Sequence, residues 1–216
     1  MAEIYANKTY KAYKTYMTYK NENLIPPHGG YRNLKSFQTA TLVYDLTVEF
    51  CNSYMTNRTD KTNKSYRTYD QMVQAARSGR QNIAEACQAS GTSKKTELKL
   101  IGVARASLEE LLNDYEDFLR QNALRLWRKD EPKAQEIREL AYRTNRTNET
   151  YRTYIEKPEN FANCLICLVH QANFLLDKQL AALEKSFLEE GGFTERLYQK
   201  RTTYRTNKTN GTNMTY

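Results

Sequence analysis

A polar three-residue repeat interrupts this 216-residue chain four times and divides it into segments. Each repeat unit is Lys or Arg, then Thr, then Tyr or Asn, and the four blocks occupy residues 8–20, 57–69, 142–154 and 200–216. A period of three matches neither the two-residue alternation of a half-buried strand nor the α-helical turn of about 3.6 residues. We therefore predict that the four blocks form disordered loops and tails.

The repeat blocks also carry the excess positive charge of the chain. They contain 15 Lys or Arg and 2 Asp or Glu, a net charge of +13, whereas the whole chain is +8, so the remainder sums to −5. Eleven of the 17 tyrosines lie in the same blocks. Cations interspersed with aromatic rings are typical of surfaces that bind phosphates and stack bases. The alternative is that the blocks are passive insertions of solvated chain.

Between the blocks, apolar and small residues recur at steps of three and four, which predicts amphipathic α-helices. The first predicted helix has its seam at Leu34, Phe37, Thr41, Tyr44, Val48, Cys51 and Met55. The second has mostly small residues on its seam, which permit close approach of a partner, at Met72, Ala76, Gly79, Ile83 and Ala86. The third has adjoining seams at Ile101, Ala104, Leu108, Leu111, Tyr115 and Phe118 and at Leu98, Leu112 and Leu119. The fourth has its seam at Phe161, Leu165, Leu168, Ala172, Leu175, Gln179, Leu183 and Phe187.

Turn and cap residues separate these helices. Gly91 suits a left-handed cap after the second helix, and Thr92 or Ser93 can cap the third, so the two helices form a tight antiparallel hairpin. Pro132 starts a short helix that ends near Ala141. The predicted fold is all-α: an up-down antiparallel four-helix bundle with long helices, one short extra helix, and disordered repeat insertions in loops and tails.

A single domain accounts for the helical part of the chain. We predict a disordered N-terminal tail over residues 1–23, a bundle over 24–195 with repeat insertions at 57–69 and 142–154, and a disordered C-terminal tail over 196–216. The sequence has no long apolar run for a membrane span and no apolar signal segment near its start, so we expect a cytoplasmic protein.

The residues that could carry chemistry form no catalytic constellation. Cys164, Cys167 and His170 are spaced by three residues, and on a continuous helix such side chains fan over about 120° instead of converging on one ion. We therefore expect buried, reduced core cysteines. No enzymatic activity, metal or cofactor is predicted.

Basic residues concentrate in the hairpin between the second and third helices. Residues 77–105 carry a net charge of +4, whereas the acidic run 109–117 carries −5. The acidic side chains are expected to face solvent or to pair with Arg120 and Arg125. Phosphates would be attracted to the hairpin and its free helix N-terminal amides, and the candidate nucleic-acid-binding residues are Arg77, Arg80, Lys94, Lys95, Lys99 and Arg105.

Several stretches of the chain resemble the bacterial four-helix bundle family. They are RSGRQNIAEA at 77–86, SKKTEL at 93–98 and ARASLEEL at 104–111, while PHGGYRNL at 27–34 and DYEDFL at 114–119 resemble the branch called the four-helix bundle suffix domain. Members of the family include proteins encoded in intervening sequences of ribosomal RNA genes and the accessory variability protein of diversity-generating retroelements.

The resemblance implies a homo-oligomer, a pentamer in the retroelement protein, that binds nucleic acid and a reverse transcriptase. It also implies that Asn82 and Glu85 form a polar pair inside the bundle. We expect Glu85 to meet Arg105 or Lys99 across the hairpin, because a buried charge needs a partner.

Two functions are compatible with these features. The first is a non-enzymatic, oligomeric accessory or adaptor protein that binds RNA or DNA through the basic hairpin and the basic repeats. The second is a protein-interaction or structural module in which the repeats are functionally inert insertions.

Overall fold

The computed structural model of the chain describes residues 25, 27–55, 63–143 and 146–212. Every regular element in these residues is helical, which confirms the predicted all-helical class. The four long helices of the fold are α2 (Lys35–Tyr54), α3 (Asn63–Ala89), α4 (Lys94–Gln121) and α7 (Pro158–Glu190). The other elements are η1 (Tyr31–Asn33), α5 (Pro132–Leu140), η2 (Asn148–Tyr151), α6 (Arg152–Ile155) and α8 (Phe193–Thr212).

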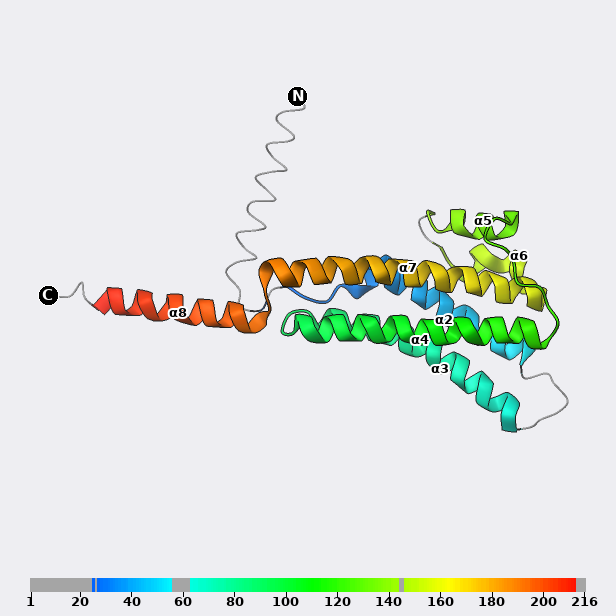
Figure 1. Cartoon of the computed structure of the whole chain (residues 1–216), viewed down its shortest axis with the longest axis horizontal. Helices are drawn as coiled ribbons and strands as arrows, with labels where there is room; N and C mark the ends of the chain where they lie inside the picture. The colour runs from blue at the N-terminus through cyan, green and yellow to red at the C-terminus, as the bar shows by residue number, and fades with distance from the viewer. Residues whose placement is uncertain (1–24, 26, 56–62, 144–145, 213–216) are drawn as a thin grey trace, which may run out of the picture.

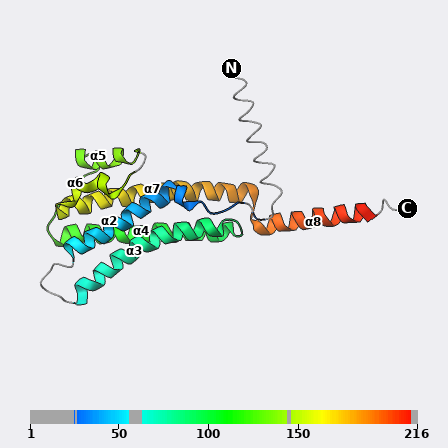
Figure 2. The same cartoon turned by 180° about the vertical axis from the view of Figure 1, so that it is seen from behind.

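The four long helices lie side by side, and consecutive ones run in opposite directions (Figure 1). Helix α4 packs against α3 and α7, and α2 also contacts both α3 and α7. The short helices α5 and α6 pack on α7 near one end of this group. Helix α8 continues beyond the other end of α7, as the reverse view also shows (Figure 2). The predicted short helix beginning at Pro132 is confirmed as α5.

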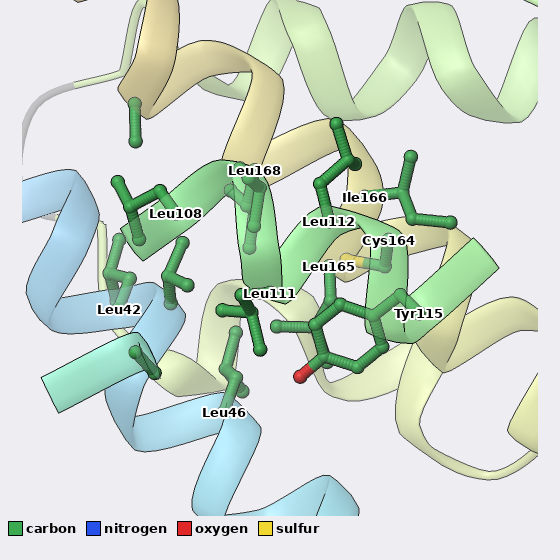
Figure 3. Packing of buried hydrophobic residues seen from close by; sticks show 14 of the residues in the cluster. Leu42, Leu46, Leu108, Leu111, Leu112, Tyr115, Cys164, Leu165, Ile166 and Leu168 are labelled. Atoms are coloured by element: carbon green, nitrogen blue, oxygen red, sulfur yellow. The ribbon is translucent and has the colours of Figure 1, made fainter. Parts of the chain in front are cut away.

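Side chains from α2, α4 and α7 converge in the centre of the core (Figure 3). Leu46, Leu108 and Leu165 are fully buried there. Removing each such side chain from water stabilises the fold by about 1.5–3 kcal/mol. The predicted seams of the third helix are confirmed for Ile101, Ala104, Leu108, Leu111, Leu112, Tyr115 and Leu119, which are all buried.

The buried face of α2 differs from the predicted one by about one residue, which rotates it by ~100°. Of the predicted seam, Cys51 is buried, and the other six residues lie half-buried beside the core. The buried face instead includes polar residues whose hydroxyls are hydrogen-bonded. Ser36 Oγ donates to Gln179 Oε1 at 2.9 Å and Thr47 Oγ1 donates to the Val43 carbonyl at 2.6 Å. The periodicity of apolar residues in the sequence does not identify buried polar residues such as these.

A glycine allows α3 and α4 to approach closely. A β-carbon at Gly79 would lie 2.7 Å from Cγ of the buried Leu108, which confirms the predicted small-residue contact. At the start of α4, Ser93 Oγ accepts a hydrogen bond from the Thr96 amide at 3.1 Å, as an N-cap does. The predicted left-handed conformation of Gly91 is wrong, because its φ is not positive and the residue is instead buried next to the His28 ring.

Helix α7 buries its first half and exposes much of its second half. The predicted seam is buried through Ala172, but Leu183 is half-buried and Phe187 is exposed. The reason is length, since α7 has 33 residues whereas α2 has 20 and begins near Gln179, the partner of Ser36. Beyond that point α7 has fewer neighbours to cover it.

Tyrosines of the third repeat block pack into the core, so the disordered loop predicted for residues 142–154 is wrong. Tyr151 and Tyr154 are 0% and 6% exposed, whereas Tyr142 is 89% exposed. Thr147 and Thr150 form a capping box at the start of η2. The block therefore contains both a helical segment and an exposed end.

An arginine of the same block connects two long helices. The Arg146 guanidinium donates to Thr39 Oγ1 of α2 at 2.9 Å and to Gln171 Oε1 of α7 at 3.3 Å. The same group donates to the Tyr151 hydroxyl at 3.4 Å. These bonds satisfy the buried Thr39, and the repeat block thereby links α2 to α7.

The period of three suits this segment because a 3₁₀-helix has about three residues per turn. Side chains at i and i+3 then share a face, and on an α-helix they are only ~60° apart. Tyr151 and Tyr154 have this spacing across the junction of η2 and α6. The repeat can therefore bury a pair of rings. A comparison of its three-residue period with strands and long α-helices alone does not predict this burial.

Two other blocks are also helical where they are described. Residues 63–69 begin α3 and residues 200–212 lie in α8, so the predicted loop and disordered tail are wrong there. In α8, Thr202 Oγ1 donates to the Tyr198 carbonyl and Thr206 Oγ1 to the Thr202 carbonyl, both at 3.0 Å, which satisfies the hydroxyls within the helix. The predicted N-terminal tail 1–23 and residues 57–62, 144–145 and 213–216 lie outside the described residues.

Two glycines test the close approach of α3 and α4. Gly79→Ala and Gly102→Ala both gain ~1 kcal/mol of helix propensity. A β-carbon at Gly102 has no neighbour within 4 Å, whereas one at Gly79 collides with Leu108. We expect Gly79→Ala to be less stable than Gly102→Ala by about 1–3 kcal/mol in chemical denaturation. Equal stabilities would contradict the close contact.

Two tyrosines test whether the third repeat block belongs to the core. Tyr151→Ala should lower the free energy of unfolding by about 3–5 kcal/mol because it empties a buried ring site. Tyr142→Ala, the same change at an exposed position of the same block, should shift it by less than about 0.5 kcal/mol. Thermal or urea unfolding measures both, and similar effects would mean that the block lies outside the core.

Candidate nucleic-acid interface

Two of the six predicted nucleic-acid-binding cations form ion pairs with α7. Lys94 Nζ lies 3.0 Å from Glu190 Oε2 and donates to Ser186 Oγ at 2.5 Å. Arg105 Nε donates to Asp177 Oδ1 at 2.5 Å. The pKa of Arg105 is raised chiefly by this hydrogen bond. Both residues therefore help to hold α4 on α7.

A third predicted cation joins α3 to α2. The Arg80 guanidinium lies 4.3 Å from the centre of the Tyr44 ring, within the range of a cation–π contact. The pKa of Asp45 is raised by burial, and the charge of Arg80 partly opposes that rise. Arg80 is half-buried and contacts α2, whereas Arg77, Lys95 and Lys99 are exposed.

The predicted polar pair inside the helices is wrong for one of its members. Asn82 is half-buried and its Nδ2 donates to the Ser78 carbonyl at 2.9 Å. Glu85 is exposed, so it has no need of a buried partner. Of its two expected partners, Arg105 pairs instead with Asp177 and, at 3.8 Å, with Glu109, and Lys99 forms no ion pair among the described residues.

Helix α8 presents basic and aromatic side chains to solvent. Tyr198 and Tyr204 are 74% and 72% exposed, and Arg201 and Arg205 are exposed as well. The helix begins just after Glu190, the residue that binds Lys94 at the start of α4. The exposed Lys95 therefore lies at the same end of the molecule as the first turns of α8 (Figure 1).

Sequence reasoning found the charge of this segment but placed it in a disordered tail. The helix was missed because its mean propensity is low and its surface is polar on all sides. The signals for this helix are local. Gly191, whose φ is positive, ends α7, and the half-buried Phe193 and Leu197 follow it one turn apart.

The acidic run of α4 is partly paired. Asp117 Oδ1 lies 2.7 Å from Arg120 Nη2, as predicted, whereas Arg125 binds Glu131 at 2.6 Å instead of a residue of the run. The pKa of Asp114 is raised to about 6, mainly by burial and to a smaller extent by the nearby carboxylates Glu110 and Asp117. One of its carboxylate oxygens is buried without a hydrogen-bond partner.

The cysteines are free thiols. Cys51 and Cys164 are buried and Cys87 and Cys167 are half-buried, in keeping with the expectation of core cysteines. Burial is the main cause that raises the pKa of the thiols, to about 11 for Cys167. Among the described residues, no group of three or more His, Cys, Asp or Glu side chains is arranged to hold a metal ion.

No family model, curated protein or solved structure matches the chain. None of the described helices combines the length and the apolar character that crossing a membrane requires.

Asp114 provides a pH test of this acidic segment. Its pKa in the folded state is higher than the usual 3.8, so the folded chain binds more protons than the unfolded chain between about pH 4 and 6. Its contribution to stability therefore falls as the pH rises through that window. Asp114→Asn should be more stable than the parent at pH 7.5, by no more than about 1 kcal/mol after solvent screening.

The advantage of Asp114→Asn should shrink as the pH falls from about 6 to 4 and disappear near pH 3, below the ordinary pKa of 3.8, where the parent carboxyl is protonated in both states. Urea denaturation of both proteins at a series of pH values measures it. Asp117→Asn is the matched control, because Asp117 is exposed and paired with Arg120, and it should give no such gain. A pH-independent difference between Asp114→Asn and the parent would contradict the raised pKa.

Proposed function

We propose that the protein is a non-catalytic accessory or adaptor protein that binds single-stranded nucleic acid at one end of an up-and-down four-helix bundle. The bundle consists of α2, α3, α4 and α7. The binding surface consists of α8 together with the exposed Lys95 of the hairpin. Lys94 and Arg105 are excluded from this surface, because they already hold α4 on α7.

The observation that carries this proposal is the composition of the exposed surface of α8. Tyr198 and Tyr204 lie within two turns of each other, and Arg201 and Arg205 lie between and beside them. An exposed ring offers a face on which any base can stack, worth about 1–3 kcal/mol per base. A neighbouring cation neutralises a phosphate and releases a counterion.

The setting of this activity is part of the same proposal. The resemblance to the four-helix bundle family supports a cytoplasmic accessory role beside a nucleic-acid enzyme such as a reverse transcriptase. The hairpin contributes less than its +4 net charge suggests, because three of its six cations contact other residues of the fold.

A protein-interaction module is the second candidate function. Leu188 and Phe187 are both exposed on the last turns of α7, where a partner could cover them. Under this reading α8 is not a nucleic-acid surface. The third repeat block contributes to the core under either reading, since Tyr151 is fully buried.

Binding of a labelled single-stranded RNA, measured by fluorescence anisotropy at several salt concentrations, tests the first function. The affinity should fall steeply with salt, because displaced counterions impose a linear dependence of log affinity on log salt concentration. Arg201→Glu combined with Arg205→Glu should weaken binding by about tenfold or more and flatten that dependence.

The matched control reverses two exposed cations at the far end of the molecule, Lys129→Glu and Arg143→Glu. It changes the net charge by the same amount and should leave most of the affinity intact. Equal losses in both double variants, or an affinity that does not depend on salt, would refute binding at α8. A chain that binds a protein partner but no RNA would favour the second function.

A further inference from the structure

The outward face of α4 carries a second heptad-spaced series. Its members are separated by steps of four and three, which is the spacing of residues that face a partner helix. All six members are exposed: Lys99, Val103, Ala106, Glu110, Asn113 and Asp117. Val103 is a β-branched apolar residue that is 47% exposed. The face lies opposite the buried seam of the same helix, so α3 and α7 do not cover it.

Two copies of this series have complementary side chains when they run antiparallel. When two copies of α4 are laid antiparallel with Val103 of one copy opposite Ala106 of the other, Lys99 falls opposite Glu110, because 103 + 106 and 99 + 110 have the same sum of 209. The two-fold symmetry repeats both contacts. The arrangement has an apolar centre and an ion pair on each side.

Two of the three charged residues on this face form no ion pair within the described part of the chain, the exception being Asp117, which pairs with Arg120. Among the ion pairs of the described residues, none involves Lys99 or Glu110, whereas the neighbouring Arg105 and Glu109 pair with each other and with other helices. Phe174 of α7 is also exposed, one residue beyond Asn173, which donates to Glu109 Oε2 at 3.0 Å.

We propose that α4 pairs antiparallel with α4 of a second copy of this chain, forming a two-fold dimer through Val103, Ala106, Lys99 and Glu110. One helix packed on one helix buries an area at the low end for specific interfaces, so the dimer is weak and reversible. The inference is independent of the nucleic-acid function, which uses α8. It assigns Lys99 to the dimer contact instead of to phosphate.

Charge reversal tests the pairing. Sedimentation velocity at low salt should show a concentration-dependent dimer of the full chain, and Lys99→Glu or Glu110→Lys should each weaken it by about tenfold or more, since each places like charges opposite one another twice. An equimolar mixture of the two variants should recover the dimer, because the heterodimer restores both ion pairs. Both positions are exposed, and circular dichroism verifies that the fold is unchanged.

Glu116→Lys is the matched control, because it makes the same charge change at an exposed position of α4 outside the series. It should leave the dimer intact. A chain that stays monomeric up to about 0.5 mM, a dimer indifferent to both reversals, or a mixture that behaves like the separate variants would each overturn the proposal. None of these outcomes bears on RNA binding, which the α8 variants test separately.

Discussion

Phe50 joins three of the long helices at one point of the core. Its ring centre lies 5.2 Å from that of Tyr115 and 4.9 Å from that of Phe118, both on α4, and 5.4 Å from that of Phe161 on α7. The edge-to-face orientation of these rings is the favourable one for aromatic pairs. The contact anchors α2 between α4 and α7, and Phe50 belongs to the observed buried face of α2 and not to the predicted seam.

The repeat blocks belong to the fold more closely than their composition suggests. Tyr151 and Tyr154 use the three-residue period to place two rings on one side of a short helical segment, and Arg146 uses its guanidinium to bridge α2 and α7. The same unit in α8 leaves Tyr204 exposed, because among the described helices none runs alongside α8 (Figure 1). One repeat therefore has two roles, and the presence or absence of a neighbouring surface decides between them.

The sequence predicted α2, α3, α4, α7 and the short α5 because their apolar periodicity is strong, whereas it missed α8. It also predicted the close contact at Gly79. It could not predict which cations remain available, since Lys94 and Arg105 meet acidic residues about 70 to 100 positions away, and such pairings depend on how the helices pack. Buried hydroxyls such as Thr47 and aromatic residues in a polar repeat such as Tyr151 were missed because burial of polar sequence depends on specific hydrogen-bond partners.

Residue-resolved amide hydrogen exchange tests the central claim most directly, namely that the third repeat block is part of the helical core. The amides of residues 152–155 should exchange slowly, with protection approaching that of Phe50 in α2, because opening them requires removal of Tyr151 and Tyr154 from the core. Exchange of these amides at the rate of an unstructured peptide, while α2 stays protected, would contradict the account.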